Sequence, residues 1–586
     1  MKKLSIISPI FALLFAVPAM GQELHKDITV EQQVNPSRRD AARIGVLPTV
    51  SLSPVKAAEL TYSNKVVTTN VPNTFTTLDP VSWGESLFTS PYRGYLDLGI
   101  GGPLMAGDVS AGYRILDRDK TRMSLWGQYN GDIYKRSSTT WHDHTASFGL
   151  DVNHTVGNNA RLSAGVDYTY GFHDMPAWEE GRFSQSTSRI NVNVGLDGRN
   201  SGLDYSAALR YSHFGFYNPH IPGLTLPDQG VNPSIPVVDP YNGYLPVRQN
   251  LMGLSLGASL ETSEVSHLGV EINGDFLATG KHYEAIVPFA EDNISPVRSR
   301  TTGLVTATPY YELQSAAATL RLGADVNFAI NSGKTIRVAP DVTLAWHGTQ
   351  IFGIEVRAHG GSTLNTLASL YDITPYMNGS VAYRASHMPY VLDARMVFGP
   401  FFGTTVELFG GYAKADDYLM PVAGDIYPAG AVWQSLDIKG YRYGARIGYD
   451  NGKNIAFRAS YEGAPSKYDK AWYDNHDRAR HVIDAELKIR PVSRLLLTIG
   501  YEMRAGRACY AFDEDFTVNI AGHDVYEPQR VSLGAVSNLT FGAGFTATDR
   551  LTLFLRGENL LGRKAMYLGF RPMQNINGMI GAALKF

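Results

Sequence analysis

Short and long connections between strand-like segments alternate over most of this 586-residue chain. Tight turns, rich in the Gly, Pro, Asn and Asp residues that favour turns, occur at Ala547–Asp549, Pro491–Ser493, Asp450–Lys453 and Gly399–Phe401. Longer connections separate them, at about 561–576, 507–531, 464–480 and 415–432. A transmembrane β-barrel has short turns at one end and long loops at the other, so it must show this alternation, whereas a sandwich or propeller has no reason to.

The same alternation continues towards the amino terminus. Short links are expected near 117–121, 157–159, 198–201, 262–265, 314–316 and 347–349. The longest loop, about 215–248, falls on the long side. From Tyr95 we count about 22 strands, an even number as in bacterial single-chain barrels. The strands are least clearly bounded near 266–288, 301–313 and 380–398. The sequence therefore predicts an all-β fold, an antiparallel transmembrane β-barrel with both termini in the periplasm.

Individual segments show the period of two that a strand with one apolar face requires. In the run HVIDAELKIR, apolar residues alternate with the charged residues Asp484, Glu486, Lys488 and Arg490. Alternation alone does not separate a barrel from a soluble sandwich. In a transmembrane barrel the apolar face meets lipid and the polar face lines the lumen. We therefore expect these four charges to face the lumen in an ionic network, with a role in solute selectivity as a secondary possibility.

The last residues are a strand of the same kind. Phe586, Leu584, Ala582 and Ile580 share one face, and the chain ends within the strand on an aromatic residue. The termini of soluble proteins tend to be loose and polar. Such an ending is common in outer-membrane barrels.

The amino terminus has the features of a cleaved secretory signal: two lysines, an apolar stretch Leu4–Ala16 and small residues up to Gly21. The stretch is shorter than the ~20 residues of a spanning helix. No long uncharged apolar run follows it, so membrane insertion is expected as a barrel. We expect a signal at 1–21, a Pro-containing periplasmic or lumenal segment at 22–92 and an outer-membrane barrel at 93–586.

The carboxy-terminal third contains the run GENLLGRKAMY, with Glu558, Asn559, Leu560 and Tyr567, and a final strand that ends at Phe586. These features resemble the carboxy-terminal hairpins of TonB-dependent outer-membrane receptors. The likeness covers about the last fifty residues in detail and the barrel as an architecture. The resemblance implies receptor-like uptake, with TonB as a candidate partner.

The chain departs from that family at its amino terminus. Family members carry a plug domain in the lumen, but only about 70 residues separate the expected signal from the first strand, fewer than a plug needs. The chain thus resembles a receptor barrel without its plug, a form that also occurs among Bacteroidetes-type outer-membrane proteins. A lumen of this width is plugged in known barrels. Candidates to fill it are Gln22–Asp79, inward-folded long loops or a partner subunit.

The loop Tyr217–Val247 is the best candidate for binding a ligand. It holds seven prolines, which lower the cost of ordering it. Tyr217, Tyr241 and Tyr244 could stack on a sugar or peptide. The alternative is a lid that only seals the barrel mouth.

Possible metal ligands are weaker. His142 and His144, in a predicted extracellular loop, could share one face of an extended chain, and Asp513 and Asp515 could hold Ca²⁺. None has a defining spacing, so solvated polar loops are the simpler interpretation. We expect neither metal nor cofactor. The single cysteine, Cys509, excludes an intramolecular disulfide framework.

Two functions remain open on sequence grounds. The first is solute uptake or a channel, with capture at the extracellular loops. The second is a non-transporting barrel subunit of a larger outer-membrane complex, docking through its loops and amino-terminal segment. Expected partners are outer-membrane lipid, the barrel-insertion machinery and either TonB or a lipoprotein. The net charge of −3 gives no reason to expect nucleic acid, and no defensible catalytic constellation indicates an enzyme.

Overall fold

The computed structural model describes residues 92–586 with internal gaps. The gaps are 103, 119, 137–138, 158, 177–181, 218–247, 281, 286–293, 298–299, 350, 378–384, 425–431, 465–478, 513–516, 521–522, 527–528 and 568–570. The expected signal and the segment Gln22–Asp79 lie outside the described residues.

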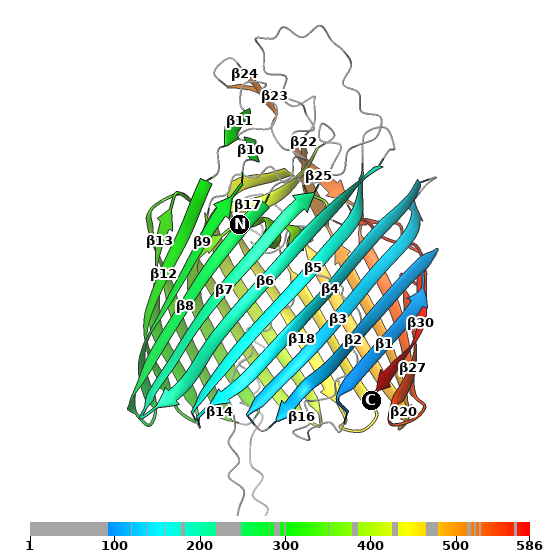
Figure 1. Ribbon diagram of the computed structural model, residues 1–586, viewed down its shortest axis with the longest axis horizontal. Coiled ribbons are helices and arrows are strands. Elements are labelled where there is room, and N and C mark those ends of the chain that lie inside the picture. The colour runs from blue at the N-terminus through cyan, green and yellow to red at the C-terminus, as the bar shows by residue number, and fades with distance from the viewer. Residues whose placement is uncertain are drawn as a thin grey trace, which may run out of the picture. The chain divides into compact units, whose positions relative to one another are not determined.

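The chain folds as an all-β transmembrane barrel of 22 antiparallel strands, which confirms the predicted fold (Figure 1). The strands of its first half are β1 (Gly94–Gly101), β2 (Met105–Arg118), β3 (Thr121–Arg136), β4 (Thr139–Val156), β5 (Ala160–Pro176), β6 (Arg182–Asn200), β7 (Leu203–Tyr217), β8 (Arg248–Ser263), β9 (Ser266–Thr279), β12 (Arg300–Gln314) and β13 (Ala318–Ile330). Those of its second half are β14 (Ile336–Thr349), β15 (Phe352–Leu364), β16 (Ala385–Phe401), β17 (Thr404–Gly424), β18 (Val432–Asp450), β19 (Ile455–Gly463), β20 (His481–Val492), β21 (Leu495–Ala505), β26 (Val536–Thr546), β27 (Leu551–Glu558) and β30 (Asn577–Lys585).

The remaining elements lie in the long connections. They are α2 (Leu367–Ile373), β10 (His282–Ala285), β11 (Ile294–Val297), β22 (Arg507–Phe512), β23 (Thr517–Ile520), β24 (His523–Tyr526), β25 (Gln529–Leu533), β28 (Met566–Tyr567) and β29 (Arg571–Pro572). Within the described residues, no helix is long and apolar enough to cross a membrane.

The predicted parity of the connections is present. At one end, which we call the short-turn end, two to four residues join each pair of strands from β2–β3 to β26–β27. The opposite, long-loop end includes the connection 218–247 between β7 and β8. Two connections at this end depart from the predicted parity, because only three residues join β1 to β2 and only two join β3 to β4. One expected loop, 415–432, is wrong in extent, because β17 continues to Gly424. A bulge between Ala415 and Tyr418 interrupts the period of two there, and Asp417 has a φ of 55°.

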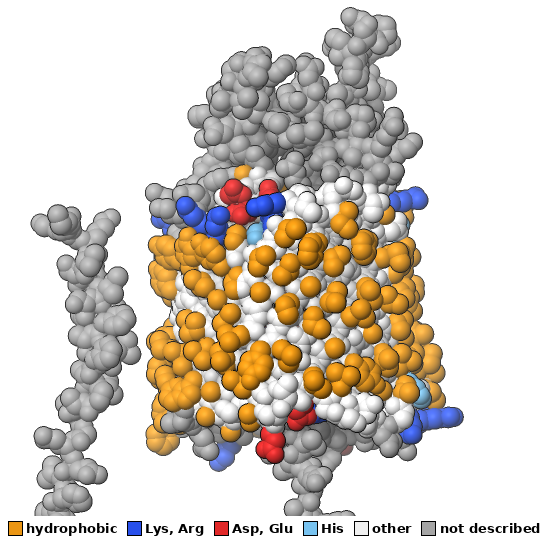
Figure 2. Space-filling model, turned by 90° about the vertical axis from the view of Figure 1, so that its left-hand side faces the viewer, with side chains coloured by type: hydrophobic (Ala, Val, Ile, Leu, Met, Phe, Trp, Pro, Cys, Tyr) orange, Lys and Arg blue, Asp and Glu red, His pale blue; other side chains and the backbone are white. Residues whose placement is uncertain are grey.

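The outer surface of the barrel is apolar. Phe148, Leu209, Met252 and Ile580 have 59, 61, 63 and 60% of their surface exposed. Figure 2 shows such side chains as a broad band around the wall, bordered by charged side chains at its ends. A soluble protein would bury these residues, whereas lipid solvates them. The outward-facing apolar set therefore identifies the transmembrane surface, which alternation in the sequence could not.

The barrel closes where β30 pairs with β1 as well as with β27. The β1 register runs from Tyr95 opposite Lys585 to Gly101 opposite Met579. At its end, the carbonyl oxygen of Phe586 accepts hydrogen bonds from Arg93 N and Gly94 N, both at 2.8 Å. This seam leaves no open sheet edge in lipid, where unpaired backbone groups are costly.

Glycine at the seam permits the close approach of the strands. A Cβ added at Gly581 would lie 2.2 Å from Leu98 O and 2.2 Å from Phe554 Cζ. Since one of these atoms is backbone, it cannot rotate away. A Cβ added at Gly448, in β18, would meet nothing within 4 Å.

We predict that Gly581→Val destabilises the folded barrel by about 1–3 kcal/mol, the usual cost of overpacking. Gly448→Val is the matched control and should have a smaller effect. The measurement is the midpoint temperature at which the barrel band shifts to the unfolded position in semi-native electrophoresis. Equal midpoints for the two variants would contradict the close approach at the seam.

Candidate lumenal site

The connection between β15 and β16 carries the short helix α2. Thr366 caps the helix: its Oγ1 accepts from Ser369 N at 3.0 Å, and Ser369 Oγ accepts from Thr366 N at 3.0 Å. This reciprocal pair satisfies amide groups that a helix leaves open at its start. Leu367 and Leu370 are buried. Because the cap and the buried leucines act locally, a helix of seven residues forms although isolated helices of this length are unstable.

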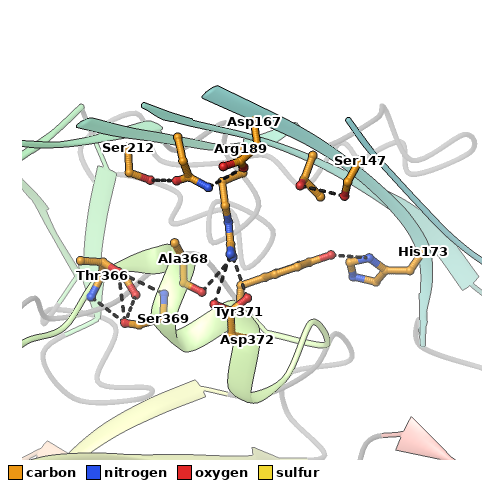
Figure 3. Close-up of polar contacts among 12 residues, drawn as sticks. Ser147, Asp167, His173, Arg189, Ser212, Thr366, Ala368, Ser369, Tyr371 and Asp372 are labelled. Carbon is orange, nitrogen blue, oxygen red and sulfur yellow. Dashed lines mark hydrogen bonds and ion pairs between the residues drawn. The ribbon is translucent and has the colours of Figure 1, made fainter. Parts of the chain in front are cut away.

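Side chains from strands several positions away around the barrel hold α2 by polar contacts (Figure 3). Arg189 of β6 donates to Asp372 Oδ1 at 2.7 Å, to Asp372 Oδ2 at 3.2 Å and to Ala368 O at 3.2 Å. Gln249 of β8 accepts from Leu367 N at 2.7 Å through its Oε1. The connection thus folds inward and reaches across to the wall formed by β6 and β8.

Tyr371 of α2 adds apolar contacts to the polar ones that anchor the helix to the wall. Its ring centroid lies 5.4 Å from that of Phe214 and 5.8 Å from that of Phe216, both on β7. Such aromatic pairs contribute about 0.5–1.5 kcal/mol each beyond the area that they bury. Burial raises the pKa of Tyr371, so its hydroxyl keeps its proton.

His173 of β5 connects Tyr371 to the residues that directly follow α2. Its Nε2 lies 2.9 Å from Pro375 O. Because a carbonyl only accepts, Nε2 carries the hydrogen and Nδ1 is left as the acceptor. The Tyr371 hydroxyl lies 3.4 Å from Nδ1 and can donate to it. An inward-folded loop was one of three fillers of the lumen considered from the sequence, and the structure shows one.

A cavity of about 700 Å³ lies against the wall beside this connection. Its charged and amide lining residues are Asn191, Arg210, Glu271, Asn273, Asp275, Arg321, Asp325 and Asp341, and its apolar ones are Leu251, Leu304 and Leu364. Hydroxyl groups of Ser212, Ser362, Thr306, Thr308, Thr363 and Thr366 complete it. The lining offers both hydrogen-bond donors and acceptors, which suits a polar solute.

The two arginines of the cavity are held in ion pairs. Arg210 Nη2 lies 2.5 and 2.7 Å from the carboxylate oxygens of Asp275. Arg321 donates to Asp341 at 2.7 Å and to Glu271 at 3.1 Å, and its guanidinium stands 3.8 Å from the ring centroid of Tyr310. Paired in this way, the guanidiniums keep fixed positions while charges of both signs line the cavity.

Of the three tyrosines proposed for ligand contact, only Tyr217 is among the described residues. It is the last residue of β7, its hydroxyl accepts from Ser188 Oγ at 3.3 Å, and Arg248 lies 5.5 Å from its ring centroid. Tyr241 and Tyr244 lie outside the described residues, so their contact with a ligand stays a prediction.

The histidines His142 and His144 belong to strand β4, so their placement in a loop was wrong. His142 Nδ1 lies 2.8 Å from Asp174 Oδ2, and His144 Nδ1 lies 3.0 Å from the Tyr129 hydroxyl. Both residues stand near the long-loop end, where polar residues occupy both faces of the strand and hide the period of two. Among the described residues, no group of three or more His, Cys, Asp or Glu is placed to hold a metal. Asp513 and Asp515 lie outside the described residues.

The charged residues of β20 lie on the strand face opposite Leu487, which pairs with the exposed Ile499. Glu486 is central: Arg458 Nε and Lys488 Nζ each lie 3.1 Å from its Oε1. Asp484 stands opposite Ser460 of β19, and Arg490 N donates to Asn454 O at 2.7 Å. A role of Asp484, Glu486, Lys488 and Arg490 in selectivity stays a prediction.

The residues that carried the family resemblance organise the connection after β27. Asn559, which follows Glu558, is buried with a φ of 48°. Its Nδ2 donates to Arg563 O and Gln574 O, and its Oδ1 accepts from Arg563 N. Leu560 N donates to Leu539 O, Tyr567 lies in β28, and Phe586 closes the barrel.

Solved structures share this barrel fold. The siderophore receptor PirA from Acinetobacter baumannii aligns over 86% of this chain and 81% of its own, with a TM-score of 0.61 and 8% identity. The FrpB iron transporter from Neisseria meningitidis aligns over 85% of this chain and 82% of its own, with a TM-score of 0.61 and 12% identity. A ferric enterobactin receptor (PfeA) mutant from Pseudomonas aeruginosa aligns over 85% of this chain and 81% of its own, with a TM-score of 0.60 and 11% identity.

At these identities the likeness establishes the fold, so the receptor-like barrel expected from the sequence is confirmed as an architecture. No protein-family model matches the chain. No curated protein matches it either.

We predict that Tyr371→Ala weakens the anchoring of α2 by about 3 kcal/mol, because it removes a buried aromatic ring. Asp372→Asn should cost less than about 1 kcal/mol, since Asp372 is 59% exposed and its ion pair is screened. The measurement is single-channel conductance of each purified variant in planar bilayers. More frequent large openings are expected for Tyr371→Ala than for Asp372→Asn, and the reverse order would contradict the aromatic anchor.

Proposed function

We propose that this chain is an outer-membrane, receptor-like barrel that takes up a large polar solute of the ferric-siderophore class, captured at its long-loop end. The observation that carries the proposal is the polar cavity of about 700 Å³ beside the inward-folded α2 connection. A binding cavity on the inner wall, next to a segment held there by non-covalent contacts, suits solute capture followed by passage. The shared fold with siderophore receptors and an iron transporter supports the same proposal.

The remaining expectations belong to this proposal. Residues 22–92 form a periplasmic or lumenal segment after signal cleavage near Gly21, and Gln22–Asp79 acts with the α2 connection as a minimal plug. Contact with TonB or a lipoprotein would take place at the periplasmic end, and the barrel-insertion machinery would place the protein in the outer membrane. The protein binds and passes its solute without catalysis.

Uptake by cells tests the proposal directly. Cells that express the full chain should accumulate radiolabelled ferric enterobactin faster than cells with an empty vector. A variant in which a Gly-Ser linker of equal length replaces Thr366–Met377 should bind less of it and admit vancomycin, because the lumen is less obstructed. Deletion of Gln22–Asp79 should also increase vancomycin sensitivity.

Purification in mild detergent distinguishes uptake by a lone barrel from a role as a subunit of a complex. A barrel that runs alone and conducts ions once α2 is replaced agrees with uptake. A barrel that always carries a stoichiometric partner, in cells whose accumulation of the siderophore equals that of the empty vector, would overturn the proposal in favour of a complex subunit.

A further inference from the structure

Strand pairing in the barrel wall stops between β14 and β15 near the long-loop end. We call this interruption the β14–β15 seam; it is distinct from the β30–β1 closure. Pairing of these strands runs from Thr349 opposite Phe352 to Asp341 opposite His359. Beyond that point, residues 336–340 of β14 stay paired with β13, and no pair with β15 is present in this described stretch. The end of β15 pairs with β16 alone, and its Ser362 N donates to Asn327 Oδ1 at 3.1 Å. The end of β15 therefore leaves the wall where it leads into the α2 connection, whereas β16 stays paired with β17 as far as His387 opposite Asp416.

Arg337 bridges this seam. Its Nη2 lies 2.6 Å from Asp417 Oδ2 on β17, so β14 is tied to β17 across β16, which stays paired with β17 here. Its Nη1 is also buried, yet no hydrogen-bond partner for that atom is present among the described residues. Buried donors almost always have an acceptor, so this N–H group is available to an acceptor on a ligand.

Arg337 lines a second cavity, of about 330 Å³, together with Lys334, His387 and Asp416. Asp416 is engaged by Lys414 Nζ at 3.0 Å, and Asp417 by Arg337. Within the described part of the chain, Lys334 forms no ion pair. His387 Nδ1 is occupied by Ser362 Oγ at 2.9 Å. With the carboxylates neutralised, the groups left to meet a ligand are the Lys334 ammonium and the Arg337 Nη1 donor, and both favour an anion.

The cavity borders the apolar outer surface of the barrel. Ile336 and Val338 also line it, and they are 55 and 57% exposed on the wall that faces lipid. Figure 2 shows basic side chains along the upper border of the apolar band, with acidic side chains beside them. A ligand here therefore meets a cationic group and an apolar surface together, as the headgroup and acyl chains of a lipid do. Basic pockets of membrane proteins recognise anionic headgroups in this way.

We propose that the cavity at the β14–β15 seam binds the phosphate group of a membrane lipid, with Lys334 and Arg337 as its donors and the acyl chains along Ile336 and Val338. The lipid would supply the acceptor that Arg337 Nη1 lacks and would cover the seam where the strand pairing stops. This site is separate from the lumenal cavity and does not depend on solute uptake.

Native mass spectrometry of the full chain, released from nanodiscs of phosphatidylcholine with a minor fraction of phosphatidylglycerol or lipid A, tests the proposal. The wild type should retain an anionic lipid in preference to phosphatidylcholine. Lys334→Gln should lower the apparent affinity roughly tenfold, as expected for loss of one charge-assisted contact. Lys453→Gln, at an exposed turn of the short-turn end, is the matched control and should behave as the wild type. Since Lys334 forms no ion pair in the described residues, its substitution should leave the electrophoretic folding assay unchanged.

Titration with inorganic phosphate separates two sources of the same chemical group. If phosphate displaces the retained lipid from the wild type but not from Lys334→Gln, the headgroup phosphate occupies the cavity. If phosphate protects the wild type against thermal unfolding and no anionic lipid is preferred, the site binds a phosphate-bearing solute instead, which overturns the lipid assignment. Identical retention and identical phosphate response of the wild type and Lys334→Gln would overturn the site itself.

Discussion

The structure depends on one constraint, the closure of the barrel wall by strand pairing. Lipid offers no hydrogen bonds, so an unpaired edge would leave a row of amide and carbonyl groups without partners. The pairing of β30 with β1 closes the wall between the first and last strands, and Phe586 continues this pairing through its backbone oxygen and nitrogen. Gly581 allows the close approach because it has no side chain to meet Leu98 O.

Closing 22 strands creates a second requirement, because a lumen of that width is plugged in known barrels. The α2 connection fills part of this lumen, and side chains of the barrel wall hold it there. Tyr371 packs against Phe214 and Phe216, while Arg189 pairs with the exposed Asp372. The buried ring provides most of the anchoring, because an ion pair with an exposed partner contributes little. An anchor of this kind holds the segment in place and can still be released by a modest free energy.

The fold could be predicted from the sequence because its signals are local. Period-two alternation, as in the run from Ile483 to Ile489, and Gly- or Pro-containing turns are set by neighbouring residues, and they located the strands and their parity. The same reasoning wrongly placed a loop at 415–432, because the bulge beside Asp417 inserts a residue and shifts the period of two. It also placed His142 and His144 in a loop, because their strand is polar on both faces near the long-loop end and shows no period of two.

The lumenal site could not be predicted in this way. Arg189 and Asp372 are 183 residues apart in the chain, and no local pattern links them. The helix that carries Asp372 has seven residues, too few for a period of 3.6 to stand out. The arginine and carboxylate residues of the larger cavity come from several strands, so only their convergence in the closed wall makes them a site.

The inward-folded α2 connection narrows the lumen of the closed 22-strand barrel. A density map of the full chain in a lipid nanodisc tests it most directly. We predict continuous density for β30 beside β1 and density for α2 inside the barrel, with the Tyr371 ring packed against both Phe214 and Phe216. A map with α2 outside the barrel, and the inner wall at Phe214 open to solvent, would contradict it.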